Sequence, residues 1–205
     1  MSATPRQHLI ASDPVMARVV ESVGRMPRAS RRAAPDDHYG ALVRAIVGQQ
    51  LSVAAAATIH GRLLDEFDGV APTPQQLLDF DPAALRAVGL SGAKTAYIRS
   101  LAEHVLSGEL EVDRLEELGD EEVIAELTAV KGIGEWTAHM FLIFQLQRRD
   151  VLPVGDLGIR SAVRRWYELP ELPGAEQIGE IAEPWRPHRS LASRYLWRSL
   201  AVTPV

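Results

Sequence analysis

The hydrophobic positions along this chain recur mostly at the 3.6-residue spacing of an amphipathic helix. Three segments show the spacing most clearly: YGALVRAIVGQQ (39–50), GAKTAYIRSLAEHVL (92–106) and EWTAHMFLIFQLQ (135–147). No segment shows a convincing alternation of apolar and polar residues, which is the pattern of a half-buried strand. We therefore predict an all-α fold built from many helices of about 8–16 residues.

Residues suited to helix ends flank these segments. Short polar side chains accept hydrogen bonds from the N–H groups of a first helical turn, and glycine is favoured just after a last turn. Thr73 and Gln76 form a T-x-x-Q capping box, while Gly89 and Gly108 are each expected to end a helix. The residues predicted to open helices are Ser12, Ser52, Thr73, Asp81, Ser91 and Asp120.

The order of the helical segments indicates two lobes. A chain of 205 residues can form one compact unit or two small lobes. Residues 36–144 form one continuous helical block, and we predict that residues 1–35 pack together with residues 145–205 as the second lobe. The segment RRDVLPVGD (148–156), which contains proline and glycine, is the predicted crossing between the lobes.

The composition excludes several kinds of site. The chain contains no cysteine, so disulfides, thiolate zinc sites and cysteine-ligated iron–sulfur clusters are excluded. Its six histidines are scattered, and none pairs at a metal-ligand spacing such as HExxH. No apolar stretch approaches the ~18 residues of a membrane span, and the N-terminus lacks a signal-peptide pattern. We expect a cytoplasmic protein without a membrane partner.

The charge is unevenly distributed. The net charge is -5, which by itself argues against a nucleic-acid partner. However, nine acidic residues gather between positions 109 and 126, while basic residues gather at 25–32, 159–165 and 186–198. Such runs are usually solvated faces, so this clustering permits DNA binding without indicating it.

The segment VKGIGEWTAHMFLIF (130–144) is the most informative. Gly132 and Gly134 lie between two predicted helices, where glycine would be costly inside a helix but suits a tight turn. The N–H groups at a helix N-terminus bind anions, and glycines let the anion approach the backbone. The pattern therefore indicates a helix-hairpin-helix that grips a DNA phosphate. The alternative is a simple helix–helix turn.

Five motifs in the same order resemble one known family. LTAVKGIGEWTA (127–138), followed by Asp156 in VLPVGDLGIR, resembles the helix-hairpin-helix, Gly/Pro-rich-loop, aspartate superfamily of DNA glycosylases. Three further stretches, at 42–59, 89–102 and 184–200, resemble its alkylation-repair branch, the DNA-3-methyladenine glycosylase II family. The resemblance covers residues from about 8 to 200. It implies a two-lobed fold with a cleft between the lobes and a hairpin at about 120–144. Some members carry an extra N-terminal β domain, which we do not expect in a chain of 205 residues.

The resemblance assigns the catalytic role to Asp156. Cleavage of an N-glycosidic bond builds oxocarbenium-like charge on the deoxyribose, which a fixed carboxylate can stabilise. The same group can orient or deprotonate the attacking water. Without the family context, an aspartate in this loop would most often be the N-cap of the following helix. Both roles can belong to one residue.

Trp136 occupies the position at which superfamily members with lyase activity have a nucleophilic lysine. The chain has only two lysines, Lys94 and Lys131, and neither matches that position. The resemblance therefore implies a monofunctional enzyme. It also implies that Trp136 and Trp197 stack on the cationic ring of an alkylated purine. The alternative for each tryptophan is core packing.

The resemblance also implies roles for residues in the base pocket and at the DNA contact. Met140 stands where some members have a tyrosine in the base pocket, so it is expected to line that pocket. Gln50 matches the residue that is inserted into the duplex when the base leaves the stack, although Gln49 and Gln50 could instead cap a helix end. The expected DNA contacts are Gly132, Ile133, Gly134, Thr137 and Gln50.

The family's hairpin also binds a monovalent cation, sodium or potassium, through main-chain carbonyls. The matching positions are Thr128, Val130 and Ile133. No iron–sulfur cluster and no catalytic metal are expected. The expected partner is duplex DNA with alkylated bases, bound by a monomer. Two alternatives stay open: a glycosylase for deaminated, oxidised or mismatched bases, and a catalytically silent protein that binds damaged DNA.

Overall fold

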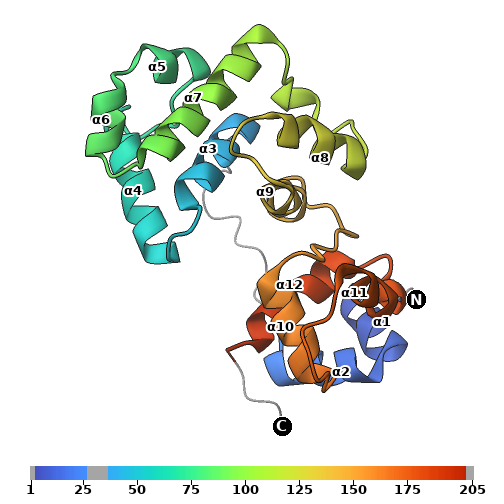
Figure 1. Ribbon diagram of the computed structural model, residues 1–205. Coiled ribbons are helices and arrows are strands. Elements are labelled where there is room, and N and C mark those ends of the chain that lie inside the picture. Colours follow the sequence, from blue (N-terminus) through green and yellow to red (C-terminus); the bar gives the residue numbers. More distant parts are fainter. Residues whose placement is uncertain (1–2, 27–36, 202–205) are drawn as a thin grey trace. The chain divides into compact units, whose positions relative to one another are not determined.

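The computed structural model describes residues 3–26 and 37–201, and every regular element within these ranges is helical (Figure 1). The prediction of an all-α fold is therefore confirmed. Most of the basic segment 25–32 lies outside the described residues. Among the described helices, none has both the length and the apolar character needed to cross a membrane. The chain forms two compact units, which within the described residues are 37–146 and 3–26 with 147–201.

The unit of residues 37–146 is built around α3, which packs against both α4 and α7. Leu42 and Ile46 of α3 are fully buried, as are Ile98 and Leu101 of α7, so these two helices share the centre of the unit. Helix α8 packs against α9. The elements are α3 (His38–Gly48), α4 (Val53–Asp65), α5 (Pro74–Asp79), α6 (Pro82–Ala87), α7 (Gly92–Ser107), η1 (Val112–Arg114), α8 (Asp120–Ala129), α9 (Glu135–Met140) and the π-helical turn η2 (Phe141–Gln145).

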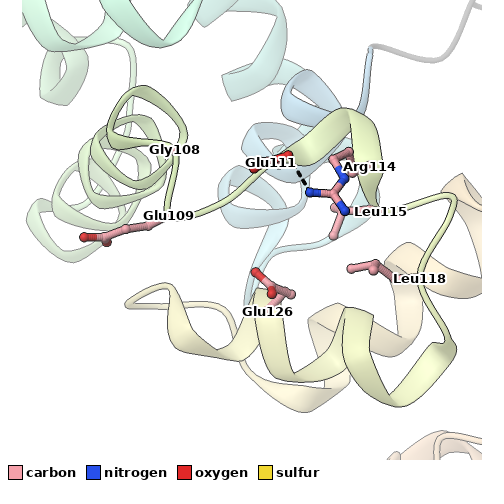
Figure 2. Close-up of a pocket in the computed structure, with 7 residues that line it drawn as sticks. All are labelled: Gly108, Glu109, Glu111, Arg114, Leu115, Leu118 and Glu126. Carbon is pink, nitrogen blue, oxygen red and sulfur yellow. Dashed lines mark hydrogen bonds and ion pairs between the residues drawn. The ribbon is translucent and has the colours of Figure 1, made fainter.

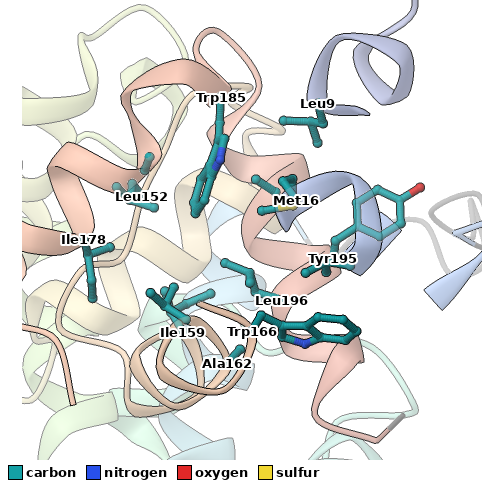
Figure 3. Close-up of a cluster of buried hydrophobic side chains, with 14 of the residues drawn as sticks. Leu9, Met16, Leu152, Ile159, Ala162, Trp166, Ile178, Trp185, Tyr195 and Leu196 are labelled. Atoms are coloured by element: carbon teal, nitrogen blue, oxygen red, sulfur yellow. The ribbon is translucent and has the colours of Figure 1, made fainter. Parts of the chain in front are cut away.

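The unit of residues 3–26 and 147–201 encloses an apolar core that is rich in aromatic rings (Figure 3). Trp166 and Trp185 are almost completely buried there. Their indole N–H groups donate to Ser199 Oγ at 2.9 Å and to Asp13 Oδ2 at 2.8 Å, so the buried polar atoms of both rings are satisfied. The elements are α1 (Pro5–Ser12), α2 (Pro14–Val23), α10 (Leu157–Trp166), α11 (Ala175–Ala182), η3 (Glu183–Trp185) and α12 (Arg189–Ser199).

Most predicted helix starts are confirmed. The side chains of Ser52, Asp81 and Ser91 cap α4, α6 and α7, and Thr73 forms the expected capping box with Gln76. Gly108 follows α7 with φ 77°, as expected of a glycine that ends a helix.

One predicted start is wrong. Ser12 is the last residue of α1, and Asp13 caps α2 by accepting hydrogen bonds from the N–H groups of Val15 and Met16. The prediction missed α1, whose apolar periodicity is weak. Asp120 opens α8 as predicted, as its first helical residue. Gly119 is the N-cap of α8, and its N–H donates to the Glu122 carboxylate at 2.8 Å.

The segment 148–156 does not form the crossing that we expected, because the division between the units falls between Leu146 and Gln147. Asp150 accepts hydrogen bonds from the guanidinium groups of Arg186 and Arg189, at 2.7 and 2.8 Å. The Val151 N–H donates to Ser190 Oγ at 2.9 Å. These contacts with the segment before α12 and with its first turn hold the loop within its own unit, next to Asp156.

Candidate active site

The glycine-rich segment forms a tight turn between α8 and α9. Helix α8 ends at Ala129, and the Ile133 N–H donates to the Val130 carbonyl at 3.1 Å across the turn. The Ile133 side chain is buried, so this residue anchors the turn in its unit. Gly134 then serves as the N-cap of α9, and its carbonyl accepts the Ala138 N–H at 3.1 Å. The prediction of helix, turn and helix is confirmed in residues 120–140.

The two glycines of the turn meet different surroundings. Gly132 has φ 92°, and a Cβ on it would lie 2.1 Å from Cγ of Tyr97, so the Tyr97 ring packs directly on this backbone. Gly134 has an ordinary φ of -98°, and a Cβ there would meet nothing within 4 Å. Packing therefore requires the first glycine. The second leaves an open approach to the backbone at the start of α9.

The turn between α3 and α4 lies against the hairpin. Gln49 is the C-cap of α3, which agrees with the alternative that it caps a helix end, and its side-chain Nε2 donates to the Gly132 carbonyl at 2.8 Å. Gln50 is exposed and has φ 57°, in the left-handed region. Lys94 Nζ of α7 donates to the Val47 carbonyl at 2.8 Å, which satisfies a carbonyl in the last turn of α3.

Trp136 borders a hollow of about 540 Å³ on the same unit. Its side chain is not part of the core, since 50% of it is exposed. The other lining residues are Arg44 and Gly48 of α3, Leu51, and the α4 residues Val53, Ala56, Ala57, His60 and Gly61. This lining was not predicted from the sequence. The only signal was the run of small residues VAAAA at the start of α4, which leaves space beside the indole.

Asp156 is held at the start of α10 by two hydrogen bonds to one oxygen. Its Oδ1 accepts from the Ile159 N–H at 2.7 Å and from the Trp197 Nε1 at 2.8 Å. The residue is 9% exposed. Asp156 is thus the N-cap of α10, one of the two roles considered for it. Gly158 makes room for this arrangement, because a Cβ there would lie 3.0 Å from both Asp156 Oδ1 and Trp197 Cδ1.

The candidate residues form two groups, one in each unit. Asp156 and Trp197 touch each other in the unit of residues 3–26 and 147–201. The other candidate residues lie in the unit of residues 37–146: Gln50, Thr128, Val130, Gly132, Ile133, Gly134, Trp136, Thr137 and Met140. Of the residues on α9, Thr137 is buried and Met140 is partly buried.

A second hollow in that unit has the opposite electrostatic character (Figure 2). It measures about 230 Å³ and is lined by Glu109, Glu111 and Glu126, with Arg114 as its one cation. Arg114 donates to the Glu111 carboxylate at 3.0 Å, so its charge is already engaged. A phosphate backbone would be repelled from this acidic surface. Its position agrees with the acidic segment 109–126 seen in the sequence.

Comparison with known proteins identifies the chain's relatives. Residues 43–187 match the HhH-GPD superfamily of base excision DNA repair proteins. DNA-3-methyladenine glycosylase 1 of Schizosaccharomyces pombe is 38% identical over 194 residues, which cover 94% of this chain and 85% of that protein. DNA-3-methyladenine glycosylase 2 of Escherichia coli is 35% identical over 164 residues, 76% of this chain and 55% of that protein.

Comparison with solved structures gives relatives of the same kind. A complex of the S. pombe 3-methyladenine DNA glycosylase with abasic DNA superposes with a TM-score of 0.88 at 35% identity, covering 99% of both chains. A DNA-3-methyladenine glycosidase from Bacillus halodurans gives a TM-score of 0.81 at 36% identity, with 97% of this chain and 89% of that chain covered. The chain therefore belongs to the HhH-GPD superfamily of base excision DNA repair proteins, in its DNA-3-methyladenine glycosylase branch.

Proposed function

We propose that this protein hydrolyses the N-glycosidic bond of alkylated purines, of the 3-methyladenine and 7-methylguanine class, in duplex DNA. The observation that carries the proposal is the Asp156 carboxylate, held by two N–H donors at the start of α10. Relatives that match most of this chain are named DNA-3-methyladenine glycosylase or glycosidase.

Asp156 supplies the charge that the reaction needs. As the bond between C1′ and the base nitrogen breaks, the bonding electrons leave with the base, and positive charge builds on the sugar. A carboxylate in a fixed orientation stabilises that charge and directs water to C1′. The two hydrogen bonds from Ile159 and Trp197 keep Oδ1 from rotating, so little reorientation is needed when the charge develops.

Trp136, Met140 and Trp197 are the proposed base-binding residues. The half-exposed indole of Trp136, beside an apolar hollow, offers a face on which a cationic ring can stack. Such cation–π contact contributes ~0.5–2 kcal/mol and favours charged over neutral bases. Methylation also makes the purine a good leaving group, so a strong general acid is dispensable. Met140 adds a polarizable side chain that donates no hydrogen bond.

The tryptophan at position 136 also supports a monofunctional enzyme. An indole cannot attack the sugar as a lysine amine would. Lys94 is directed at the Val47 carbonyl, and Lys131 precedes the hairpin glycines. The proposed product is therefore an abasic site in an uncut strand.

The hairpin is the proposed grip on DNA. Backbone N–H groups at Gly132, Gly134 and Thr137 would contact a phosphate, and Ile133 would anchor the turn in the core. Gln50 would fill the gap left by the flipped nucleotide.

A monovalent cation would be held by the carbonyls of Thr128, Val130 and Ile133. Thr128 lies in the last turn of α8, and Val130 and Ile133 lie in the turn that follows. The Val130 carbonyl also accepts the Ile133 N–H. The ion would supply positive charge to a phosphate. We further propose that the protein is cytoplasmic, acts as a monomer and needs no iron–sulfur cluster.

The test is base release from methylated duplex DNA, resolved by chromatography, with strand breakage followed in the same tube. We expect free 3-methyladenine or 7-methylguanine, and breaks only after alkali. No release from methylated DNA, together with release of hypoxanthine or another neutral base from a duplex that carries that base, would support the alternative glycosylase. Tight binding to damaged DNA without any release would support the silent protein, and breaks before alkali would contradict the monofunctional assignment.

A further inference from the structure

We propose that Gln49 is a positioning residue that fixes the Gln50 turn to the hairpin, so that the two DNA-contacting elements act as one rigid body. This inference rests on the proposed function, in which the hairpin grips a phosphate and Gln50 enters the duplex. Gln49 itself need not touch DNA. Its side chain is partly buried and points to the backbone of the hairpin.

The first observation is the hydrogen bond between Gln49 and the hairpin. Nε2 of Gln49 donates to the Gly132 carbonyl at 2.8 Å, across 83 residues of sequence. The backbone N–H of Gln49 donates to the Ile46 carbonyl at 3.3 Å, so the same residue also ends α3. One side chain thus connects the end of α3 to the first glycine of the hairpin.

The second observation is that α7 supports both partners from behind. Lys94 Nζ donates to the Val47 carbonyl, two residues before Gln49. One turn further along α7, the Tyr97 ring packs on Gly132 so closely that no Cβ fits between them. The three contacts form a closed chain from α3 through Gln49 to the hairpin, through Tyr97 to α7 and through Lys94 back to α3.

The third observation is the conformation of the turn itself. Gln50 has φ 57°, which L-residues adopt only when the surrounding structure holds them there. Ser52 then caps α4 by accepting the Ala55 N–H at 3.2 Å, so the turn is fixed at its far end as well. Gln50 is therefore an exposed residue of a turn that is held by the side chains of Gln49 on one side and Ser52 on the other.

This rigidity has a clear use in base excision. A residue that replaces a flipped nucleotide must resist the tendency of the duplex to close again, and it can do so only if its support is fixed relative to the phosphate grip. If the turn were loosely held, Gln50 would leave the duplex while the hairpin stayed bound to the phosphate. Loss of Gln49 should therefore impair the step in which the base leaves the stack, and leave phosphate binding intact.

The experiment compares Gln49→Ala with the wild type on two duplexes, one with the lesion in a normal pair and one with the same lesion in a mismatch that already weakens stacking. Single-turnover base release should fall about five- to tenfold on the paired lesion, the effect of one lost hydrogen bond, and far less on the mismatched lesion. Gln75→Ala is the matched control, because it removes a glutamine hydrogen bond on α5.

A double-mutant cycle with Gln50→Ala identifies the route of the effect. If Gln49 acts through Gln50, then Gln49→Ala should cause little further loss in a Gln50→Ala background. Equal losses on both duplexes, or fully additive losses, would overturn the positioning role. Failure of the proposed function looks different, since the wild type would then release no alkylated base from either duplex.

Discussion

Trp197 donates its indole N–H to Oδ1 of Asp156 at 2.8 Å, joining α12 to the start of α10 across 41 residues of sequence. The same oxygen accepts the Ile159 N–H, so the carboxylate is fixed by one donor from its own helix and one from a neighbouring helix. An orientation set this way does not depend on substrate. The two residues that the family resemblance assigned to catalysis and to base stacking are thus direct partners.

Asp156→Asn should separate catalysis from folding. Asparagine retains an oxygen that can accept from both Ile159 and Trp197, and it is as good an N-cap as aspartate, so the melting temperature should change little. Only the negative charge is removed. We expect base release to fall by at least about 10²-fold while the Kd for lesion-containing DNA stays within a small factor. Single-turnover chromatography and fluorescence anisotropy measure the two quantities, and near-normal turnover would show that Asp156 is not the catalytic carboxylate.

Trp197→Phe tests what the indole contributes. Phenylalanine keeps an aromatic face but cannot donate to Asp156. If orientation of the carboxylate matters, the rate of base release should fall about fivefold, as expected for one lost hydrogen bond, with KM little changed. If stacking alone matters, phenylalanine should preserve most of the rate.

Trp166→Phe is the control for that variant. It removes an indole hydrogen bond of similar length, 2.9 Å to Ser199, from the core of the same unit. It should lower the melting temperature without a specific loss of turnover in folded enzyme. A comparable loss of turnover in both variants would assign the Trp197 effect to general stability.

The two hairpin glycines should respond differently to alanine. In Gly132→Ala, the new Cβ would collide with Tyr97 and occupy a left-handed conformation, so we expect a loss of unfolding free energy of about 3 kcal/mol. In Gly134→Ala, the methyl group meets open space, so stability should be kept. If a phosphate approaches this backbone, DNA affinity should nevertheless fall about tenfold. Denaturant titration and DNA binding give the two readouts, and unchanged affinity in Gly134→Ala would contradict the proposed grip.

Trp136→Ala should change base preference more than stability. The indole is half exposed, so its removal should leave the melting temperature nearly unchanged. Release of 3-methyladenine, which is cationic while it is attached to the sugar, should fall about tenfold. Release of a base that is neutral in the nucleotide should fall less, because cation–π contact favours the charged ring. The ratio of the two single-turnover rates measures this. Phe144→Ala, which removes another exposed aromatic ring of the same unit, should leave the ratio unaltered.

Stability should decline on mild acidification because of His139. Burial lowers the pKa of this imidazole below its ordinary value of 6.5, and the carboxylates of Glu135 and Asp120 only partly oppose the shift. The folded state therefore binds the proton less readily than the unfolded state. The associated stability is present above about pH 6.5 and is lost as the pH falls toward the folded pKa. Melting temperatures at about pH 7.5 and 5.5 should differ less in His139→Leu than in the wild type. An identical difference in the two proteins would exclude His139 as the cause.

The sequence predicted the helices well where local chemistry decides them. The T-x-x-Q box at Thr73 and the serines before α4 and α7 act within three residues, so their hydrogen bonds can be read from spacing alone. The wrong prediction that Ser12 caps α2 also concerns neighbouring residues. Two adjacent residues could cap α2, and Asp13 takes that role while Ser12 completes α1.

The sequence by itself thus determined the helical class, most helix starts, the hairpin and the position of Asp156, because each depends on residues that are near neighbours in the chain. Only the tertiary structure decided which side chains meet: Trp197 with Asp156, Gln49 with the Gly132 carbonyl, and Tyr97 with one hairpin glycine but not the other. These contacts join residues that lie tens of positions apart. They depend on how whole helices pack, and this packing cannot be predicted from the spacing of residues along the chain.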